Sequence, residues 1–312
     1  MSLVSTDRSI RALLKQGLEQ LRAASVPSFT LAAELLLLHV IGQDRTWLYS
    51  HPEEILPEPT AEAYLALLAS RCSGIPTQHL TGKQEFWGLE FEVTPDVLIP
   101  RPETEHLIEV ALDRLAVREI RAGRQPRLNG ENVTLVDIGT GSGCIAVTLA
   151  KELSAATVYA TDISKAALEI ARRNATRLGV ADRIQFLQSN LLEAFAKRQA
   201  KSQESPFFDL ILSNPPYVSL RDAESLPIEV REHEPHAALF GGEEGYELYG
   251  ALIPQAAEHL KPGGLLVLEL GFNSLPAVEP LLDRDDWVNV GVTKDLAGIP
   301  RVIAAERLSP PR

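Results

Sequence analysis

Cysteine is scarce in this chain: Cys72 and Cys144 are its only two in 312 residues, and they lie far apart. So few cysteines exclude a disulfide framework and provide no metal-ligand spacing, so we expect free thiols in a reducing compartment and no metal site. Long apolar runs are also missing. The stretch at residues 31–42 contains Glu34 and His39 and is too short to span a bilayer, and the N-terminus lacks the apolar core of a signal peptide. These absences predict a cytoplasmic protein without a membrane partner.

Basic residues are outnumbered. The chain has 30 Lys and Arg against 42 Asp and Glu, for a net charge of -12. An acidic balance disfavours a surface that neutralises many phosphates, so we expect a protein or small-molecule partner and no direct binding of nucleic acid. The 45% hydrophobic content is ordinary for a globular core, and the length suggests two domains, or one domain with an appendage.

The first part of the chain, residues 1–73, has helical periodicity. Apolar residues share one face of a first helix: Ile10, Leu13, Leu14, Leu18 and Leu21. A second helix is predicted after Ser28, with an inward face made of Leu31, Leu35, Leu38 and Ile41. We therefore expect a small N-terminal helical bundle.

Residues 74–102 have a different pattern of apolar and polar residues. Apolar and polar residues alternate around Phe86-Trp87-Gly88-Leu89, which predicts a β-hairpin. Two prolines then bracket Arg101 in the segment IPRPETE, so its backbone is stiff. The segment is predicted to link two domains and to border a substrate channel.

From residue 103 to 312, short apolar strands alternate with helical segments, which indicates an α/β fold with a parallel sheet. The expected strands are residues 134–139, 157–163, 183–189, 208–214 and 264–271. A weaker pair at residues 287–295 and 301–308 suggests an antiparallel edge.

A glycine-rich turn, VDIGTGSGC, follows the first of these strands. Gly139, Gly141 and Gly143 remove side chains where the backbone turns tightly and approaches a ligand. The dinucleotide fingerprint GxGxxG would need glycine where this chain has Cys144. Asp137 beside the turn is unfavourable for a pyrophosphate and favourable for a cation.

Polar residues also follow the next two strands. Asp162 is placed to accept both hydroxyls of a ribose, Asn190 to read an adenine edge, and Leu191 to pack against the ring. A cationic ligand with a ribose and an adenine fits this pattern, and S-adenosylmethionine is the candidate cofactor.

The fourth strand ends in the motif Asn-Pro-Pro-Tyr. A residue before proline is held extended, so Asn214 and Pro215 form a rigid loop. The Asn214 side-chain oxygen and the Pro215 carbonyl then offer two fixed acceptors for the two hydrogens of a planar NH2 group. Tyr217 offers a ring on which the flat group can stack. The alternative interpretation is a turn, because Pro-Pro ends strands and Asn favours turns.

Together, DIGTGSG, Asp162 and NPPY resemble the class I S-adenosylmethionine-dependent N-methyltransferases. The flanking segment GIPTQHLTGKQEFWGLEFEVTPDVLIPRPETE and the late LKPGGLLVLELG resemble the release factor glutamine methyltransferases, which methylate the glutamine amide of the GGQ motif in peptide-chain release factors. The resemblance implies a Rossmann-like, seven-stranded, mostly parallel sheet with one antiparallel edge strand. It also implies a substrate-recognition domain at residues 1–73, a hairpin linker at 74–102 and a methyltransferase domain at 103–312.

Roles for individual residues complete this prediction. With Asp137 added for its charge, the expected cofactor site is Asp137, Gly139, Thr140, Gly141, Ser142, Gly143, Asp162, Asn190, Leu191 and Asn214. The glutamine amide is held by Asn214, Pro215, Pro216 and Tyr217, with Asn214, Pro215 and Tyr217 catalytic, and Arg101 and Glu103 border the substrate entrance. The chain departs from the family in having Asn190 where an acid is frequent, Leu191 where an aromatic is frequent, and Asn273 in place of a glutamine.

Two other functions remain open at this point. NPPY also occurs in methyltransferases of adenine, cytosine or guanine amino groups, which must grip a polynucleotide and often extrude the base. The net charge of -12 argues against this alternative. A nicotinamide-dependent oxidoreductase is disfavoured by the GxGxG spacing and by the absence of a Tyr-Lys or His hydride site.

Overall fold

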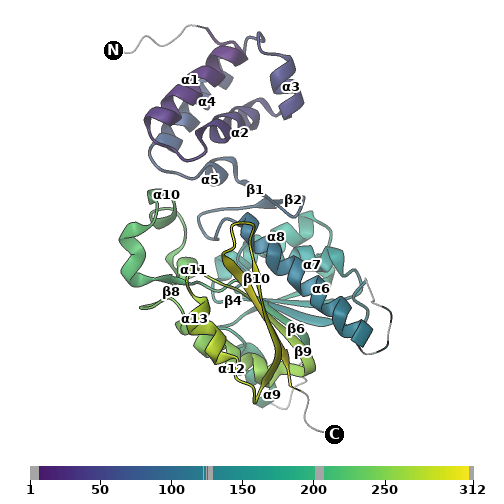
Figure 1. Ribbon diagram of the computed structural model, residues 1–312. Helices are drawn as coiled ribbons and strands as arrows, with labels where there is room; N and C mark the ends of the chain where they lie inside the picture. Colours follow the sequence, from purple (N-terminus) through teal and green to yellow (C-terminus); the bar gives the residue numbers. More distant parts are fainter. Residues whose placement is uncertain (1–6, 122, 124, 126–128, 201–206, 309–312) are drawn as a thin grey trace. The chain divides into compact units, whose positions relative to one another are not determined.

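The computed structural model describes residues 7–121, 123, 125, 129–200 and 207–308 (Figure 1). It divides into two compact units. The first comprises Met1–Lys83 with Pro227–His233, and the second comprises Gln84–Leu226 with Glu234–Arg312.

The first unit is helical. Its core is formed by buried apolar side chains, among them Leu21, Leu36, Leu37, Tyr64 and Leu68. The predicted inward residues Ile10, Leu13 and Leu21 of the first helix are buried. The helices are α1 (Ile10–Ala23), α2 (Phe29–Ile41), α3 (Arg45–Ser50), α4 (Glu58–Cys72), α5 (Thr77–Thr81) and α10 (Ile228–Arg231).

Half of the predicted inward face of α2 is wrong: Leu38 and Ile41 pack, partly buried, against the helical core, but Leu31 and Leu35 do not. Leu31 is 45% exposed and Leu35 is 37% exposed. The buried residues are instead Ala32, Ala33, Glu34, Leu36 and Leu37. Leucines lie on every side of this helix, so periodicity alone allowed more than one inward face. Packing against α1 and α4 selects the face, and small alanines allow a close approach there.

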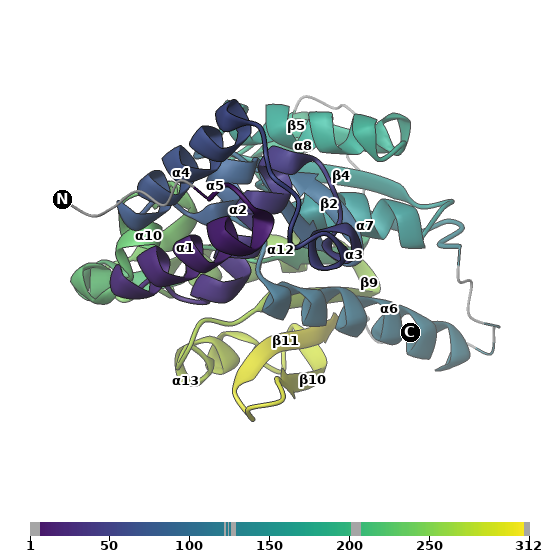
Figure 2. The ribbon, with the colours of Figure 1, turned by 90° about the horizontal axis from the view of Figure 1, so that it is seen from above.

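The second unit contains the predicted parallel sheet. Seven strands lie in the order β10-β11-β9-β6-β3-β4-β5. Figure 2 shows β5 toward one end of the sheet and β10 toward the other. The strands are β3 (Thr134–Ile138), β4 (Thr157–Asp162), β5 (Ile184–Gln188), β6 (Phe208–Ser213), β9 (Leu260–Glu269), β10 (Trp287–Lys294) and β11 (Pro300–Arg307).

One strand of this sheet runs against the others. β11 pairs antiparallel with both β9 and β10, whereas the pairs among β9, β6, β3, β4 and β5 are parallel. The seven-stranded, mostly parallel sheet is therefore confirmed. The reversed strand, however, is second from the edge, because β10 folds back on β11 and takes the edge position.

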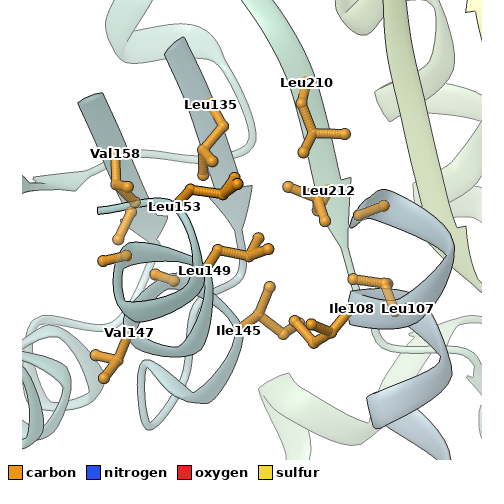
Figure 3. Close-up of a cluster of buried hydrophobic side chains, with 14 of the residues drawn as sticks. Leu107, Ile108, Leu135, Ile145, Val147, Leu149, Leu153, Val158, Leu210 and Leu212 are labelled. Carbon is orange, nitrogen blue, oxygen red and sulfur yellow. The ribbon is translucent and has the colours of Figure 1, made fainter. Parts of the chain in front are cut away.

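Helices cover both faces of the sheet. On one face, α6 (Glu105–Arg121), α7 (Cys144–Glu152) and α8 (Lys165–Arg177) pack against the strands. Figure 3 shows this layer, in which Leu107 and Ile108 of α6 and Ile145 and Leu149 of α7 meet the strand residues Leu135, Val158, Leu210 and Leu212. On the other face lie α9 (Glu193–Ala200), α12 (Glu247–His259) and α13 (Leu275–Val278).

The predicted hairpin is present as β1 (Lys83–Phe86) and β2 (Leu89–Glu92), which pair with each other. Trp87 and Gly88 between them have positive φ angles of 55° and 67°, as a tight hairpin turn requires. Phe86 and Phe91 are buried in the same core as α6 and α7, so most of the hairpin packs with the second unit.

Short elements complete the second unit. They are η1 (Pro102–Thr104), η2 (Ala181–Arg183), β7 (Val218–Ser219), η3 (Leu220–Ser225), α11 (His236–Leu239), β8 (Phe240–Gly242) and η4 (Glu279–Leu281). Of the helices in the described part of the chain, none combines the length and the apolar character that a membrane crossing requires.

Asn174 fastens three segments together. This fully buried side chain accepts a hydrogen bond from the Glu92 N–H at 2.7 Å and donates to the carbonyls of Glu92 and Ser142, both at 2.9 Å. It thereby joins the hairpin, the glycine-rich turn and α8.

We expect Asn174→Ala to lower the free energy of unfolding by about 2 kcal/mol or more, because it leaves buried backbone groups unpaired. The matched control is Arg173→Ala, which removes an exposed ion pair to Glu92, the residue that Asn174 also contacts. An exposed pair of this kind contributes about 0–1 kcal/mol. Denaturant unfolding of both variants measures the difference, and equal losses would contradict this role for Asn174.

Candidate active site

The predicted site residues gather at the edge of the sheet where the parallel strands end. The glycine-rich turn follows β3, Asp162 ends β4, Asn190 follows β5 and Asn214 follows β6. The Ser213 hydroxyl donates to the Ile138 carbonyl at 2.7 Å, so the residues directly before Asn214 and Gly139 are tied together. The strand order reverses direction around β3, and such a switch point is where open α/β sheets bind ligands.

The glycines of the turn have two different environments. Gly139 and Gly141 have positive φ angles of 72° and 54°, and a Cβ added at either would meet no atom within 4 Å. A Cβ at Gly143 would lie 3.0 Å from the Ala171 Cβ and 3.2 Å from its Cα. The first two glycines thus leave open space above the turn, whereas the third allows α7 to pack against α8.

Asp137 lies beneath the turn and is fully buried. Its Oδ2 accepts hydrogen bonds from the Thr140 hydroxyl at 2.6 Å and the Ala146 N–H at 3.2 Å, and its Oδ1 has no partner among the described residues. Burial raises the pKa of Asp137 to about 7, although these two hydrogen bonds oppose the shift. Asp137 therefore shapes the turn from inside and has no surface of its own for a ligand.

Asp162 bridges two loops. Its Oδ2 accepts from the Gly141 N–H at 2.9 Å and its Oδ1 from the Ser164 N–H at 2.8 Å. Burial raises the pKa of Asp162, and these backbone hydrogen bonds oppose the increase. The carboxylate is only partly buried. It is thus held beside the open space above Gly141 with lone pairs left for further donors.

Asn190 and Leu191 lie at the end of the neighbouring strand. Asn190 is exposed, and its Nδ2 donates to Glu193 Oε1 at 2.9 Å, which leaves its Oδ1 as an acceptor. Leu191 has a positive φ angle of 48° and packs partly against the core on the α12 face.

Asn214 is oriented by a residue that sequence reasoning missed. Its Nδ2 donates to the Thr104 hydroxyl at 3.1 Å, so its Oδ1 is the end left to accept hydrogen bonds. Thr104 is buried at the end of η1, directly after the segment IPRPE. No chemistry-bearing motif marks this threonine in the sequence.

Tyr217 packs against the end of β9. A Cβ added at Gly271 would lie 2.7 Å from a carbon of the Tyr217 ring, so the glycine makes room for that ring. The Tyr217 hydroxyl faces Glu269 Oε1 at 3.4 Å, a long contact. Burial and then the Glu269 charge raise the pKa of the Tyr217 hydroxyl above its usual value.

Glycines also support the NPPY loop from behind. A Cβ at Gly241 would lie 2.3 Å from the Pro216 carbonyl oxygen, and one at Gly245 would lie 2.6 Å from the Tyr217 carbonyl oxygen. β7 and β8 pair in parallel beside these contacts. The loop is therefore fixed by backbone packing as well as by its prolines.

Arg101 and Glu103 lie near the same loop. Arg101 pairs with the buried Glu234 carboxylate at 2.5 Å. The Arg101 charge opposes the rise in the Tyr217 pKa that burial causes. Burial raises the pKa of the Glu269 carboxyl to about 7, and the nearby Glu103 charge adds to this shift. The stiff IPRPETE segment thus lies close to the NPPY loop.

A separate cavity of about 770 Å³ lies at the opposite edge of the sheet, where the strands begin. Its lining includes Val133, Asp209 and Lys261, and none of the predicted site residues. The convergence of polar side chains at the carboxyl edge, and not this cavity, defines the candidate site.

Comparison with known proteins adds independent information. The PrmC N-terminal domain family matches residues 12–82, and the methyltransferase small domain family matches residues 126–229. The crystal structure of the hMettl16 catalytic domain in complex with MAT2A 3'UTR hairpin 1 is similar in fold. Its TM-score is 0.53 at 17% identity, covering 84% of this chain and 88% of that chain.

Curated relatives match over nearly the whole length. The release factor glutamine methyltransferase of Koribacter versatilis is 43% identical over 299 residues, which cover 96% of this chain and 99% of that protein. The protein of the same name from Bradyrhizobium diazoefficiens is 40% identical over 306 residues, covering 98% of this chain and 97% of that protein. At this identity and coverage the chain is a methyltransferase, and it belongs to the release factor glutamine methyltransferase family.

Proposed function

We propose that this enzyme transfers a methyl group from S-adenosylmethionine to the side-chain amide nitrogen of the glutamine in the GGQ motif of peptide-chain release factors. The observation that carries the proposal is the orientation of Asn214. Because its Nδ2 is used on Thr104, its Oδ1 presents an acceptor to a planar NH2 group. The names of the relatives supply the class of substrate.

The residues at the carboxyl edge fit S-adenosylmethionine. The open space above Gly139 and Gly141 accommodates a ligand close to the backbone. Asp162 would accept from the ribose hydroxyls, Asn190 Oδ1 from the adenine amino group, and Leu191 would contact the ring. When bound, this cofactor supplies an electrophilic methyl group on a sulfonium. Thr140 and Ser142 complete the proposed cofactor site. Asp137 and Gly143 shape the turn from inside, and Asn214 is assigned to the substrate amide.

The substrate amide would be held by the NPPY loop. Asn214 Oδ1 and the Pro215 carbonyl accept its two N–H groups, and Pro216 and Tyr217 bound the flat amide. An amide nitrogen is a poor nucleophile because its lone pair is delocalised. Two fixed acceptors favour the positive charge that develops on nitrogen, and orientation alone can contribute on the order of 7 kcal/mol or more to lowering the barrier. The substrate nitrogen would gain the methyl group as the bond from that carbon to sulfur breaks, which leaves a neutral thioether. The nitrogen is then positive and more acidic, and it would lose its proton to water.

The rest of the chain has a role in this proposal. Residues 1–73 recognise the release factor, residues 74–102 form the linking hairpin, and residues 103–312 carry the chemistry. Arg101 and Glu103 border the entrance, close to Tyr217 and Glu269. The substrates are proteins of translation, so the enzyme works in the cytoplasm.

Labelled S-adenosylmethionine provides the first test. We expect the purified protein to transfer label to a release factor, and not to the same factor with its GGQ glutamine replaced by alanine. Scintillation counting after separation of the proteins measures the transfer. DNA and rRNA serve as competing substrates, and label on either of them, or on the replaced factor at an equal rate, would refute the proposal.

The proposed role of Asn214 is tested by substitution. Asn214→Ala is expected to lower kcat by about 10² or more, the loss seen when one preorganised polar contact is removed. Cofactor affinity should change little. The contrasting variant is Asn190→Ala, which should weaken S-adenosylmethionine binding and leave kcat at saturating cofactor nearly unaltered. Steady-state kinetics with both substrates separates the two, and an undiminished kcat for Asn214→Ala would exclude the role.

The glycine-rich turn allows a matched comparison. Gly141→Ala should weaken S-adenosylmethionine binding about tenfold or more, because its methyl group enters the open space. Gly143→Ala should lower the unfolding temperature further than Gly141→Ala, because its methyl group meets α8. Gly179→Ala, with a φ angle of 74° and open space around it, controls for backbone strain alone. Calorimetric binding and thermal unfolding measure both effects, and normal cofactor affinity in Gly141→Ala would contradict this assignment.

A further inference from the structure

Glu269, the last residue of β9, lies against the NPPY loop. It falls in LKPGGLLVLELG, a segment that resembles the family, but no pattern in the sequence gives its carboxylate a role. β6 and β9 pair in parallel with Ser213 opposite Leu268. The next residues in this register are Asn214 and Glu269, so the carboxylate and the amide leave neighbouring strands at the same level. Glu269 is 1% exposed, and Val267, Leu268 and Leu270 around it in sequence are fully buried.

The Thr104 hydroxyl contacts Asn214 and lies near Glu269. A hydroxyl has one proton, and here its oxygen accepts from Asn214 Nδ2 at 3.1 Å. The Thr104 proton must therefore point away from the amide. The Glu269 carboxyl leaves the neighbouring strand at the level of Asn214, and the nearby Thr104 hydroxyl opposes the rise in its pKa that burial causes. No hydrogen bond of regular geometry joins these two side chains, and Oε2 of Glu269 has no partner among the described residues.

Other contacts fix the Glu269 side chain and the backbone at the end of its strand. Its Oε1 faces the Tyr217 hydroxyl at 3.4 Å. The Tyr249 hydroxyl donates to the Glu269 backbone carbonyl at 2.8 Å and fixes the end of the strand. On the other side, the Arg301 carbonyl accepts from the Leu270 N–H at 2.7 Å, and the Arg301 charge lowers the pKa of Glu269.

Burial of Glu269 has an energetic cost that its local contacts do not offset. Burial raises the pKa of its carboxyl to about 7, which means that the surroundings disfavour the charge. A buried carboxylate with an unpaired oxygen destabilises a fold, and an apolar side chain of similar volume would be tolerated there. The residue therefore contributes something other than stability.

We propose that Glu269 is a positioning residue for methyl transfer: its carboxylate orients the Thr104 hydroxyl so that Asn214 presents Oδ1 to the substrate amide, and it holds the Tyr217 hydroxyl. Without an acceptor at position 269, the Thr104 proton is free to point at Asn214. The Asn214 amide can then rotate by half a turn and present its NH2 group to the substrate NH2 group. Two hydrogen-bond donors would then face each other and repel. This inference rests on the function proposed above.

The experiment compares Glu269→Leu with Glu269→Gln. The leucine variant removes both acceptors and should lower kcat by about 10- to 100-fold, the size of loss caused by a displaced reacting group. Its affinity for S-adenosylhomocysteine and its unfolding temperature should equal or exceed those of the wild type. The glutamine variant keeps an oxygen for Thr104 and an N–H for Tyr217, so it should recover most of the loss. A purely structural role would instead lower stability and kcat together.

Thr104 provides the second pair of variants. Thr104→Val should lower kcat as Glu269→Leu does, and Thr104→Ser, which keeps the hydroxyl, should restore most of it. In this proposal Glu269 acts on Asn214 through Thr104, so the two single substitutions remove the same effect. The double variant Thr104→Val/Glu269→Leu should therefore be no more than about threefold slower than the slower single variant. If Glu269→Leu fails to fold, the contrast between Thr104→Val and Thr104→Ser decides the question.

The outcomes separate the two proposals. No methyl transfer by the wild type would overturn the proposed function together with this inference. Transfer by the wild type with an equal kcat for Glu269→Leu would overturn the inference alone. The inference would also be overturned if the loss of kcat in the double variant equalled the product of the two single losses, or if Thr104→Val and Thr104→Ser had equal kcat.

Discussion

The parallel pairing of β3 with β6 is the constraint on which the site depends. It sets Ile138 opposite Ser213, and the Ser213 hydroxyl closes the pair with a hydrogen bond to the Ile138 carbonyl. Parallel strands end at one edge of a sheet, so the glycine-rich turn and the NPPY loop must start side by side. A shift of one residue in this register would separate the glycine-rich turn from the NPPY loop.

Around this pair, the protein places carboxylates where water cannot reach them. Asp137 lies under the turn and Glu269 lies behind the NPPY loop, both almost completely buried. Burial raises the pKa of each to about 7, which means that their surroundings disfavour the charged form of both carboxyls. Preorganised polar groups of this kind are costly to fold and are suited to holding hydroxyl and amide groups in one orientation.

The methyltransferase chemistry was predictable from short motifs. Each motif lies next to its own signal for a strand end or a turn, as do the glycines, Asp162, Asn214 and Tyr217. The topology of the sheet then brings these separate motifs to one edge. The supporting residues were not predictable in this way. Thr104 and Gly271 lie 110 and 57 residues from Asn214, and although both fall in segments that resemble the family, no pattern gives either residue a role at the site. The prediction of the inward face of α2 was wrong for Leu31 and Leu35, because leucines on all sides left the choice to the packing partners.

The sequence alone determined the class of fold, and it predicted the edge of the sheet and the residues of the candidate site, because these follow from periodicity, glycine placement and the stiffness that prolines impose. Only the tertiary structure decided which end of the Asn214 amide faces outward and what fixes it there. It also showed that Asp137 is enclosed by the turn and that Gly143 serves packing between α7 and α8. The physical reason is that a hydrogen bond has a direction, and that direction depends on neighbours that the fold, and not the chain order, brings into contact.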